Sequence, residues 1–290
     1  MKILEGKVAV ITGSSRGLGL AIAKAYAQHG ASVIITSRGQ KAVNQAVDAL
    51  RELDYRVDGI ACDTSKLEQV EALADFAINR FEKLDIWVNN AGISAPYGPT
   101  IAVPIERFTT VIHTNILGVY YGSLVAMRRF HQQKSGKLIN LLGRGAGKPI
   151  AFQNAYASSK AWVRSFSKAL AEESKATGVG VYLFNPGLVL TDMITNVEAV
   201  EGYEKKLSAL NTVIRMWGNP PDVPAQKALW LASPATDGKT GLEVSILTPR
   251  LLIGGALREM TRRLMRRPTT IPDIKVTQVQ DESASLLDVE

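Results

Sequence analysis

The stretch Thr12-Gly13-Ser14-Ser15-Arg16-Gly17-Leu18-Gly19 decides the fold. It follows an apolar, β-branched run at residues 8–12 and leads into a segment of helical periodicity at residues 18–29. Glycine is needed where a backbone turns tightly and approaches a phosphate, whose charge then rests on the N-terminus of the following helix. The strand–turn–helix context therefore predicts a phosphate-binding turn after the first strand of a sheet.

Short β-branched runs alternate with longer segments of helical period along most of the chain. Parallel strands need such crossovers, and the crossovers are expected to be right-handed. We therefore predict an α/β fold, a doubly wound parallel sheet of the Rossmann type with helices on both faces. The predicted strands are residues 8–12, 32–36, 57–62, 86–89, 137–142, 179–184 and 243–247, and the helices between them include residues 18–29, 41–53 and 67–81.

The chain is predicted to have one domain, residues 1–249, and an extension, residues 250–290. In the extension, Ile253, Leu257, Met260 and Leu264 recur at helical spacing, with arginines on the other faces. This amphipathic segment, residues 251–267, is expected to pack on the protein's own core or on a subunit partner. The alternative is peripheral contact with an anionic membrane surface. Pro268 and Pro272 would end the helix, and residues 278–290 are expected to be a disordered acidic tail.

Composition excludes several classes of function. The formal net charge is +7, but no long basic run occurs in the first 249 residues, so nucleic acid is not an expected partner. Cys62 is the single cysteine, which excludes an intrachain disulfide and a cysteine-based zinc site; no metal is expected. No apolar run is long enough to span a bilayer, and none precedes the first strand as a signal peptide would. We therefore expect a cytoplasmic protein.

The second predicted strand ends in Thr36-Ser37-Arg38. Dinucleotide-binding folds place an acid near this point to hold a ribose 2′-hydroxyl, or a basic residue when that ribose carries a phosphate. No acid stands here, whereas Arg38 does, and Arg16 lies in the first loop. Arginine donates bidentately to phosphate, so NADP is favoured over NAD. The alternative is that Arg38 is a solvated turn residue.

A second interpretation of the first turn has to be considered. Gly13-Ser14-Ser15-Arg16-Gly17 also matches G-x-S-x-G, the nucleophile elbow of α/β-hydrolases. Such an enzyme needs an acid and then a histidine further along the chain. The downstream histidines are His113 and His131, and neither follows a late strand. The hydrolase interpretation is therefore rejected.

Two further motifs carry a family resemblance: Asn89-Asn90-Ala91-Gly92, and Tyr156-Ala157-Ser158-Ser159-Lys160. With the glycine-rich turn they make residues 5–250 resemble a short-chain dehydrogenase/reductase. Other matching elements occur in the family's order: Asp63 after the third strand, Asn115 in the following helix, and Pro186-Gly187-Leu188-Val189-Leu190-Thr191. The resemblance implies hydride transfer between a nicotinamide and a carbonyl or alcohol, in a homodimer or homotetramer.

The spacing of Tyr156 and Lys160 places them on one helix face. An ammonium beside a phenol favours the phenolate. The resemblance implies that Tyr156 exchanges the proton, that Lys160 lowers the pKa of the tyrosine and holds the nicotinamide ribose, and that Asn115 positions a water. It further implies that Thr191 contacts the carboxamide and Asp63 the adenine. The expected cofactor contacts are Gly13, Ser15, Arg16, Gly17, Leu18, Gly19, Ser37, Arg38, Asp63, Thr64, Asn90, Ala91, Gly92, Tyr156, Lys160, Pro186, Gly187, Val189 and Thr191.

One position departs from the family pattern. The substrate-orienting serine usually stands thirteen residues before the tyrosine, where this chain has Gly143. Loss of one donor to a developing oxyanion can cost roughly 10²–10³ in rate. Either Ser94 or Arg144 replaces it, or the protein is an NADPH-binding sensor with little catalysis. The glycines at 143, 145 and 147 could also make room for a bulky, flat substrate. With Leu247-Thr248-Pro249-Arg250-Leu251-Leu252, they resemble chlorophyll b reductases, which reduce a formyl group on a tetrapyrrole.

Overall fold

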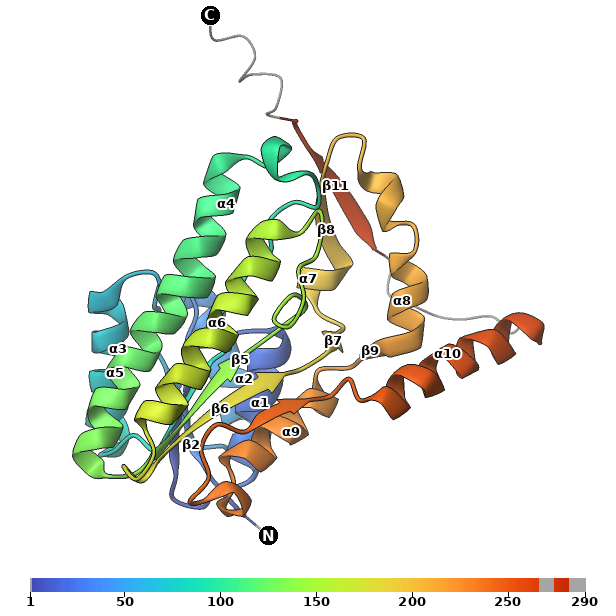
Figure 1. The fold of residues 1–290 in the computed structure, drawn as a ribbon. Helices are drawn as coiled ribbons and strands as arrows, with labels where there is room; N and C mark the ends of the chain where they lie inside the picture. Colours follow the sequence, from blue (N-terminus) through green and yellow to red (C-terminus); the bar gives the residue numbers. More distant parts are fainter. Residues whose placement is uncertain (1, 266–273, 282–290) are drawn as a thin grey trace, which may run out of the picture.

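The computed structural model describes residues 2–265 and 274–281. Its centre is a parallel seven-stranded sheet in the order β10-β6-β5-β4-β1-β2-β3 (Figure 1). This confirms the predicted doubly wound sheet, although most predicted strands are a residue or more too long or shifted. The strands are β1 Val8–Ile11, β2 Ser32–Ile35, β3 Val57–Gly59, β4 Ile86–Asn89, β5 Gly136–Leu141, β6 Val179–Asn185 and β10 Glu243–Ser245.

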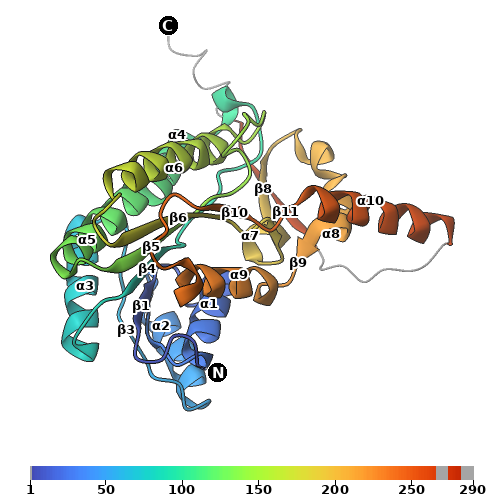
Figure 2. The same cartoon turned by 60° about the horizontal axis from the view of Figure 1, so that its bottom comes forward.

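Helices cover both faces of this sheet (Figure 2). Alternate residues of a strand point to opposite faces, so Ala9 and Ile11 of β1 pack in one apolar cluster, and Val8 and Val10 in another. The first cluster includes side chains of three helices, α1 (Gly17–Gln28), α2 (Gln40–Arg51) and α9 (Asp222–Ala232). The second includes α3 (Leu67–Phe81) and α5 (Gly118–Gln133).

Further helices follow β4 and β5. After β4 come a 3-10 turn at Thr100–Ala102 and α4 (Ile105–Ile112), which passes through a single π-helical turn at His113–Leu117 into α5. The long helix α6 (Asn154–Glu173) follows β5. Val119 of α5, Leu142 after β5 and Val163 of α6 form a small apolar cluster with Leu183. This cluster fixes α6, and with it Tyr156 and Lys160, over the carboxyl end of β5.

The segment after β6 is folded rather than a plain loop. It contains β7 (Leu188–Val189), α7 (Asp192–Thr195), β8 (Asn196–Val200), a 3-10 turn at Glu204–Leu207, α8 (Leu210–Trp217) and β9 (Gly218–Asn219). β7 and β9 pair in parallel, which closes the segment on itself. Tyr97 bridges to Ala199 of β8, so the segment is attached to the loop that follows β4.

The C-terminal extension corrects two expectations, namely that its helix packs on the protein's own core and that residues 278 and 279 are disordered, while packing on a subunit partner stays a prediction. The predicted helix is present as α10 (Pro249–Leu264), but its apolar residues Ile253, Leu257, Met260 and Leu264 are exposed rather than packed on the protein's core. Gln278 and Val279 are not disordered, because they belong to β11 (Lys275–Val279), which pairs in parallel with β8. Arg266, Arg267, Pro268 and Pro272, and the expected tail at 282–290, lie outside the described residues. No helix in the described parts of the chain is long and apolar enough to cross a membrane.

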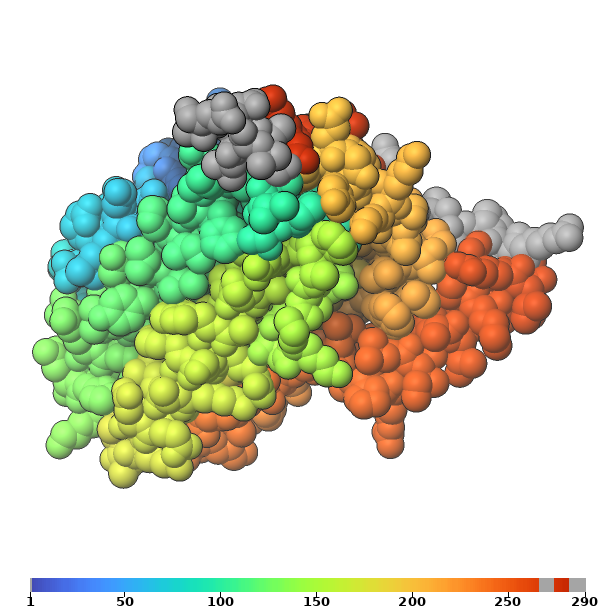
Figure 3. Space-filling view, turned by 45° about the horizontal axis from the view of Figure 1, so that its top comes forward, coloured from blue at the N-terminus to red at the C-terminus, as the bar shows by residue number. Residues whose placement is uncertain are grey.

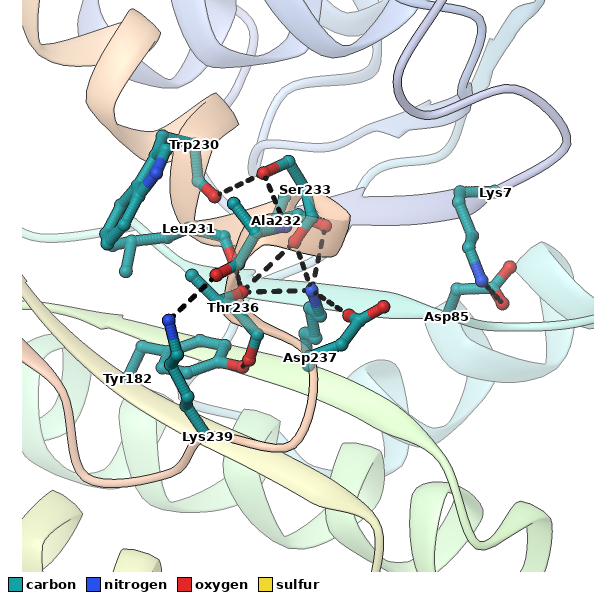
Figure 4. A network of polar contacts seen from close by, with 12 residues as sticks. Lys7, Asp85, Tyr182, Trp230, Leu231, Ala232, Ser233, Thr236, Asp237 and Lys239 are labelled. Atoms are coloured by element: carbon teal, nitrogen blue, oxygen red, sulfur yellow. Dashed lines mark hydrogen bonds and ion pairs between the residues drawn. The ribbon is translucent and has the colours of Figure 1, made fainter.

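A half-buried amine fastens one end of the sheet to α9 (Figure 4). Lys137 is the second residue of β5, and its side chain is 14% exposed. Its Nζ donates to the carbonyl oxygens of Ala232 (3.3 Å) and Ser233 (2.5 Å) and to Thr236 Oγ1 (3.0 Å), and it pairs with Asp237 (2.7 Å). The amine thus satisfies carbonyls that the end of α9 leaves without helical partners.

Candidate active site

The glycine-rich turn and the Asn90 turn meet where the strand order reverses, between β1 and β4. Thr12 Oγ1 accepts hydrogen bonds from the backbone N–H groups of Asn90 and Ala91, both at 3.0 Å. Asn90 Nδ2 donates to the carbonyl oxygens of Thr12 (2.8 Å) and Gly13 (3.1 Å). In open α/β sheets, ligands bind at the carboxyl ends of the strands at such a reversal. Two of the predicted motifs are therefore joined at that position.

The geometry of the first turn fits a phosphate. Gly13 and Gly17 have φ values of +64° and +58°, a region that favours glycine. A Cβ atom at Gly19 would overlap the carbonyl oxygen of Gly13. The first turn of α1 carries no acidic residue, and no side chain caps its N-terminus, so its amide groups favour an anion. Ser15 and Leu18, also predicted contacts, are half-buried in the same turn.

The ends of β2 and β3 carry four further predicted contacts. The carbonyl oxygen of Ser37 accepts from the backbone N–H of Cys62 (2.9 Å), which holds the two strand ends together. Arg38 is exposed beside them. The Asp63 carboxylate accepts from the backbone and the hydroxyl of Ser65 (3.0 and 2.8 Å), so its side chain stabilises a local turn. Thr64 is buried, with Oγ1 against Gly118 of α5.

The first turn also contacts the segment after β6. A Cβ atom at Gly17 would lie 3.2 Å from Cγ2 of Thr191, and Arg16 forms an ion pair of 2.9 Å with Asp192. Pro186, Gly187 and Val189 lead from β6 to this point, and Gly187 has a φ of +71°. The predicted contacts after β6 are thus brought against the predicted phosphate-binding turn. Asp192 itself was missed by the sequence analysis.

Tyr156 and Lys160 lie on the same face of α6, as their spacing predicts. Lys160 is 4% exposed, and its Nζ donates to the carbonyl oxygen of Leu141 (3.1 Å) and lies 5.6 Å from the centre of the Tyr156 ring. Burial lowers the pKa of Lys160 to about 8 and raises the pKa of Tyr156 to about 12. A Cβ atom at Gly92 would lie 3.7 Å from Lys160 Nζ. The amine is therefore buried between α6 and the Asn90 turn.

Asn115 occupies the middle of the π-helical turn and is fully buried. Its Oδ1 accepts from the backbone N–H of Ile93, and its Nδ2 donates to the carbonyl oxygen of Ile93, both at 2.9 Å. Nδ2 also donates to Ser159 Oγ at 3.1 Å. The side chain thus joins the turn after β4 to α6. Single π-helical turns of this kind occur frequently at functional sites.

Gly143 lies directly beside the phenol. A Cβ atom there would overlap the hydroxyl oxygen of Tyr156 and lie 3.1 Å from its Cζ atom. Neither predicted substitute for the family's serine hydrogen-bonds to Tyr156: Ser94 Oγ donates to the carbonyl oxygen of Ala95, and Arg144 is exposed. Within the described residues, no group hydrogen-bonds to the Tyr156 hydroxyl.

Comparison with known proteins agrees with this arrangement. Residues 7–202 match the model of the short chain dehydrogenase family, which is more than half of the chain. The chain belongs to the short-chain dehydrogenases. Its fold matches a gluconate 5-dehydrogenase of Burkholderia cenocepacia solved with NADP and tartrate. The TM-score is 0.75 at 25% identity, over 89% of this chain and 97% of that one.

Two relatives of this short-chain dehydrogenase differ in length. The 7alpha-hydroxysteroid dehydrogenase of Escherichia coli is 32% identical over 89% of this chain and 96% of its own length. A probable chlorophyll(ide) b reductase of Arabidopsis thaliana is 33% identical over 66% of this chain and 42% of its own length. The chain therefore spans about two fifths of the length of that chloroplast relative.

An aromatic cluster that the sequence analysis missed borders the site of this short-chain dehydrogenase. Its rings come from three loops: the ring centres of Tyr97 and Phe152 lie 5.6 Å apart, as do those of Phe152 and Tyr203. Lys206 Nζ lies 4.1 Å from the centre of the Phe152 ring. Phe152 has a φ of +64°, which is rare for a bulky residue. No local pattern in the sequence could reveal this cluster, because its members are far apart in the chain.

A small pocket is lined by Tyr156 and by Pro96, Gly98 and Gln153, which are neighbours in the chain of the cluster residues Tyr97 and Phe152. Val103 and Phe108, from the segment after β4, form its apolar side, and Gln153 and Asn154, at the start of α6, form its polar side. The pocket therefore offers a small site beside the Tyr156 ring.

Proposed function

We propose that this short-chain dehydrogenase is an NADPH-dependent oxidoreductase that interconverts a carbonyl group and the corresponding primary or secondary alcohol. The observation that carries the proposal is the buried Lys160 amine between the Asn90 turn and Tyr156, at the reversal of the strand order. A buried ammonium beside a phenol, in a crevice that fits a dinucleotide, is the arrangement expected of a proton-exchanging pair.

NADPH supplies the hydride when it is bound. The first turn, with Gly13, Gly17 and Gly19, would hold its pyrophosphate on the N-terminus of α1. Lys160 would donate to the nicotinamide ribose, and Thr191 would bind the carboxamide. The other contacts proposed for the cofactor are Ser15, Leu18, Ser37, Asp63, Thr64, Asn90, Ala91, Gly92, Pro186, Gly187 and Val189.

Tyr156 would give its hydroxyl proton to the carbonyl oxygen during reduction. Burial gives Tyr156 a pKa of about 12 and Lys160 a pKa of about 8, and the amine donates to the carbonyl oxygen of Leu141 rather than to the phenol. A charged Lys160 turned toward Tyr156 would lower the pKa of the phenol. Asn115 would act by holding Ile93 and Ser159 in place and by positioning a water for the proton.

Preference for NADP over NAD rests on charge. Arg16 and Arg38 flank the crevice, and no acid follows β2 to hold a ribose 2′-hydroxyl. Structural relatives were solved with either cofactor: the gluconate 5-dehydrogenase with NADP, and a 3-ketoacyl-(acyl-carrier-protein) reductase of Brucella melitensis with NADH. That chain has a TM-score of 0.74 at 30% identity, over 84% of this chain and 97% of its own.

The experiment that tests the function is NADPH oxidation measured with a panel of carbonyl compounds, including hydroxysteroid ketones and formyl tetrapyrroles. We expect turnover in the natural chain, loss of turnover in Tyr156→Phe, and unchanged NADPH binding by fluorescence in that variant. Equal turnover in Tyr156→Phe would contradict the role of the phenol.

The substrate class has two candidates. The E. coli relative is named for a hydroxysteroid and the Arabidopsis relative for chlorophyll(ide) b. The ring cluster of Tyr97, Phe152 and Tyr203 supports a flat, apolar substrate, because aromatic faces stack on such molecules. We expect Phe152→Ala to raise KM for the preferred substrate more than it lowers kcat.

A second candidate function, an NADPH-binding sensor with little catalysis, is favoured by Gly143. Ser94 and Arg144 do not hydrogen-bond to the phenol, so neither takes the place of the serine. Tight NADPH binding without turnover on any member of the panel would support the sensor and reject the enzyme.

Assembly into a homodimer or homotetramer is also proposed. Tyr120 of α5 is 40% exposed and lies edge-on to Phe166 of α6, which in turn stacks on Trp162 at 4.8 Å. Half-exposed aromatic rings of this kind are enriched at subunit interfaces. Trp162→Arg is expected to lower the molecular mass measured by light scattering.

A further inference from the structure

The helix α10 is attached to the protein by its polar side. Gly255 packs against α8, because a Cβ atom there would overlap the carbonyl oxygen of Met216 and approach the Trp217 indole. Trp217 Nε1 donates to the carbonyl oxygen of Leu252 (3.1 Å). Figure 1 shows α10 beside α8 and extending beyond it, away from the sheet. The contact with α8 therefore sets which face of α10 points outward.

One buried carboxylate with three guanidinium groups around it fixes this orientation of α10. Glu259 is 6% exposed and accepts from Arg215 of α8 (3.2 Å) and from Arg262 and Arg263 of its own helix (2.9 and 3.0 Å). The hydrogen bonds from these guanidinium groups, that of Arg262 foremost, hold the pKa of Glu259 well below its usual range. The carboxylate stays charged at neutral pH, so rotation of α10 about its axis would break several charge-assisted bonds.

The opposite side of α10 is apolar and faces outward. At about 100° per residue, Ile253, Leu257, Met260 and Leu264 fall on one stripe nearly opposite to Gly255 and Glu259. These four side chains are between 53% and 77% exposed. Figure 3 shows the helix, in orange-red, at the periphery of the molecule. An amphipathic helix of a globular protein normally turns its apolar stripe to the core; here the polar side is docked.

Charge indicates what covers this stripe. Pro249–Leu264 contains four arginines and Glu259, a net charge of 4 − 1 = +3. Arg250 lies on one flank of the stripe and Arg263 on the other. A second copy of the chain, paired helix to helix across a two-fold axis, would place +3 against +3. A layer of anionic lipid headgroups supplies the opposite charge, and its acyl chains accept the apolar side chains.

We propose that α10 is an interfacial helix that binds this protein to the surface of an anionic lipid bilayer, with the stripe Ile253, Leu257, Met260 and Leu264 buried in it. The helix would lie parallel to the membrane plane, because its stripe runs along its length. Arg250, on the flank of the stripe, would contact the headgroups while its stem lies along the apolar boundary, and Arg258 would add to the positive charge of the helix. The surface is independent of the reaction proposed above.

Binding of the full chain to vesicles tests the proposal without cofactor or substrate. We expect sedimentation with vesicles of equal parts phosphatidylcholine and phosphatidylglycerol, and much weaker binding to phosphatidylcholine alone. Leu257→Ser with Leu264→Ser should weaken binding about tenfold or more. The matched control is Leu53→Ser with Ile105→Ser, which removes two exposed apolar side chains outside α10 and should leave vesicle binding unchanged.

Charge is tested in the same assay. Arg250→Gln with Arg258→Gln should weaken binding by about fivefold for each arginine, and added salt should weaken the natural chain likewise. The control variant, Lys24→Gln with Lys66→Gln, removes two positive charges outside α10 and should leave vesicle binding unchanged. The proposal is overturned if anionic vesicles do not bind the chain, if the serine variant binds as well as the natural chain, or if that variant has a lower molecular mass in solution. The last outcome would show that a second copy covers the stripe.

Discussion

The hydroxyl oxygen of Tyr156 lies so close to the position of a Cβ atom at residue 143 that the two would overlap. Gly143 is therefore more than a missing serine, since it makes the space into which the phenol packs. Its backbone is not in the left-handed region, so the constraint comes from the side chain of Tyr156 and not from φ.

We predict that Gly143→Ala destabilises the cofactor-free protein by about 1–3 kcal/mol, because the added methyl group overpacks the site. It should also lower turnover by displacing the phenol. Thermal unfolding and NADPH oxidation measure the two effects. Gly147→Ala is the control, since a Cβ atom there meets nothing within 4 Å. An unchanged melting temperature in Gly143→Ala would mean that the phenol does not occupy this space.

Lys160 yields a prediction about pH. Burial lowers its pKa to about 8, below the value near 10.5 in an unfolded chain. Between these two values the unfolded chain binds more protons, so stability rises with pH across that window, and the cost of burying the charge is fully present below pH 8. Lys160→Met should therefore raise the free energy of unfolding at pH 7 by up to about 2 kcal/mol. This figure already subtracts the lost hydrogen bond to the carbonyl oxygen of Leu141.

The same variant should have no measurable turnover, because it removes the charge that favours the phenolate. Urea unfolding at pH 7 and at pH 10 measures the stability, and the advantage of Lys160→Met should shrink at the higher pH. A variant less stable than the natural chain at pH 7 would show that the buried amine is not destabilising.

The ion pair of Arg16 with Asp192 leads to a prediction about cofactor affinity. Both side chains are more than half exposed, so the pair stabilises the protein by no more than about 1 kcal/mol. Asp192→Asn frees Arg16 for the 2′-phosphate and should tighten NADPH binding up to about fivefold, with NADH unaffected. Arg16→Gln should weaken NADPH binding about tenfold.

Fluorescence titration with the two cofactors measures these affinities. Glu198→Gln is the control, because it breaks another exposed ion pair, with Arg107 at 2.8 Å, in the same segment. If Asp192→Asn changed NADPH and NADH binding equally, Arg16 would not be the group that distinguishes them.

The sheet was predictable because its signals are local. Residues 67–81 were predicted as a helix with the bounds that α3 has, because their apolar spacing is regular. The third strand was predicted to run to residue 62 but ends at Gly59, where its pairing with Ile35 stops. The sequence of one strand does not show where its pairing with the neighbouring strand ends, so the end of β3 could not be predicted from residues 57–62 alone.

The parts that were missed depend on contacts between distant residues. β11 exists because Val276 and its neighbours pair with β8, about 80 positions earlier in the chain. The outward direction of the α10 stripe is set by Arg215 of α8, which holds Glu259. In the candidate site, the order of motifs predicted which residues meet, but the contact between Gly143 and Tyr156 depends on how α6 is seated over β5.

Lys137 gives a prediction about stability away from the site. Its amine has four oxygen partners around it, two of them carbonyls at the end of α9, and burial lowers its pKa. Lys137→Met keeps the apolar stem but removes a donor that these two carbonyls and the Thr236 hydroxyl share, which should cost about 1–3 kcal/mol of unfolding free energy, since the Ser233 carbonyl keeps its hydrogen bonds from Thr236. Lys239→Met is the matched control, because Lys239 is exposed and donates to a single carbonyl, that of Ala235.

Urea unfolding of both variants measures the difference in stability. The KM for NADPH should stay the same, since Lys137 lies at the amino end of β5 and the candidate site at the carboxyl end. Equal stability of the two variants would show that the half-buried amine does not hold α9 to the sheet.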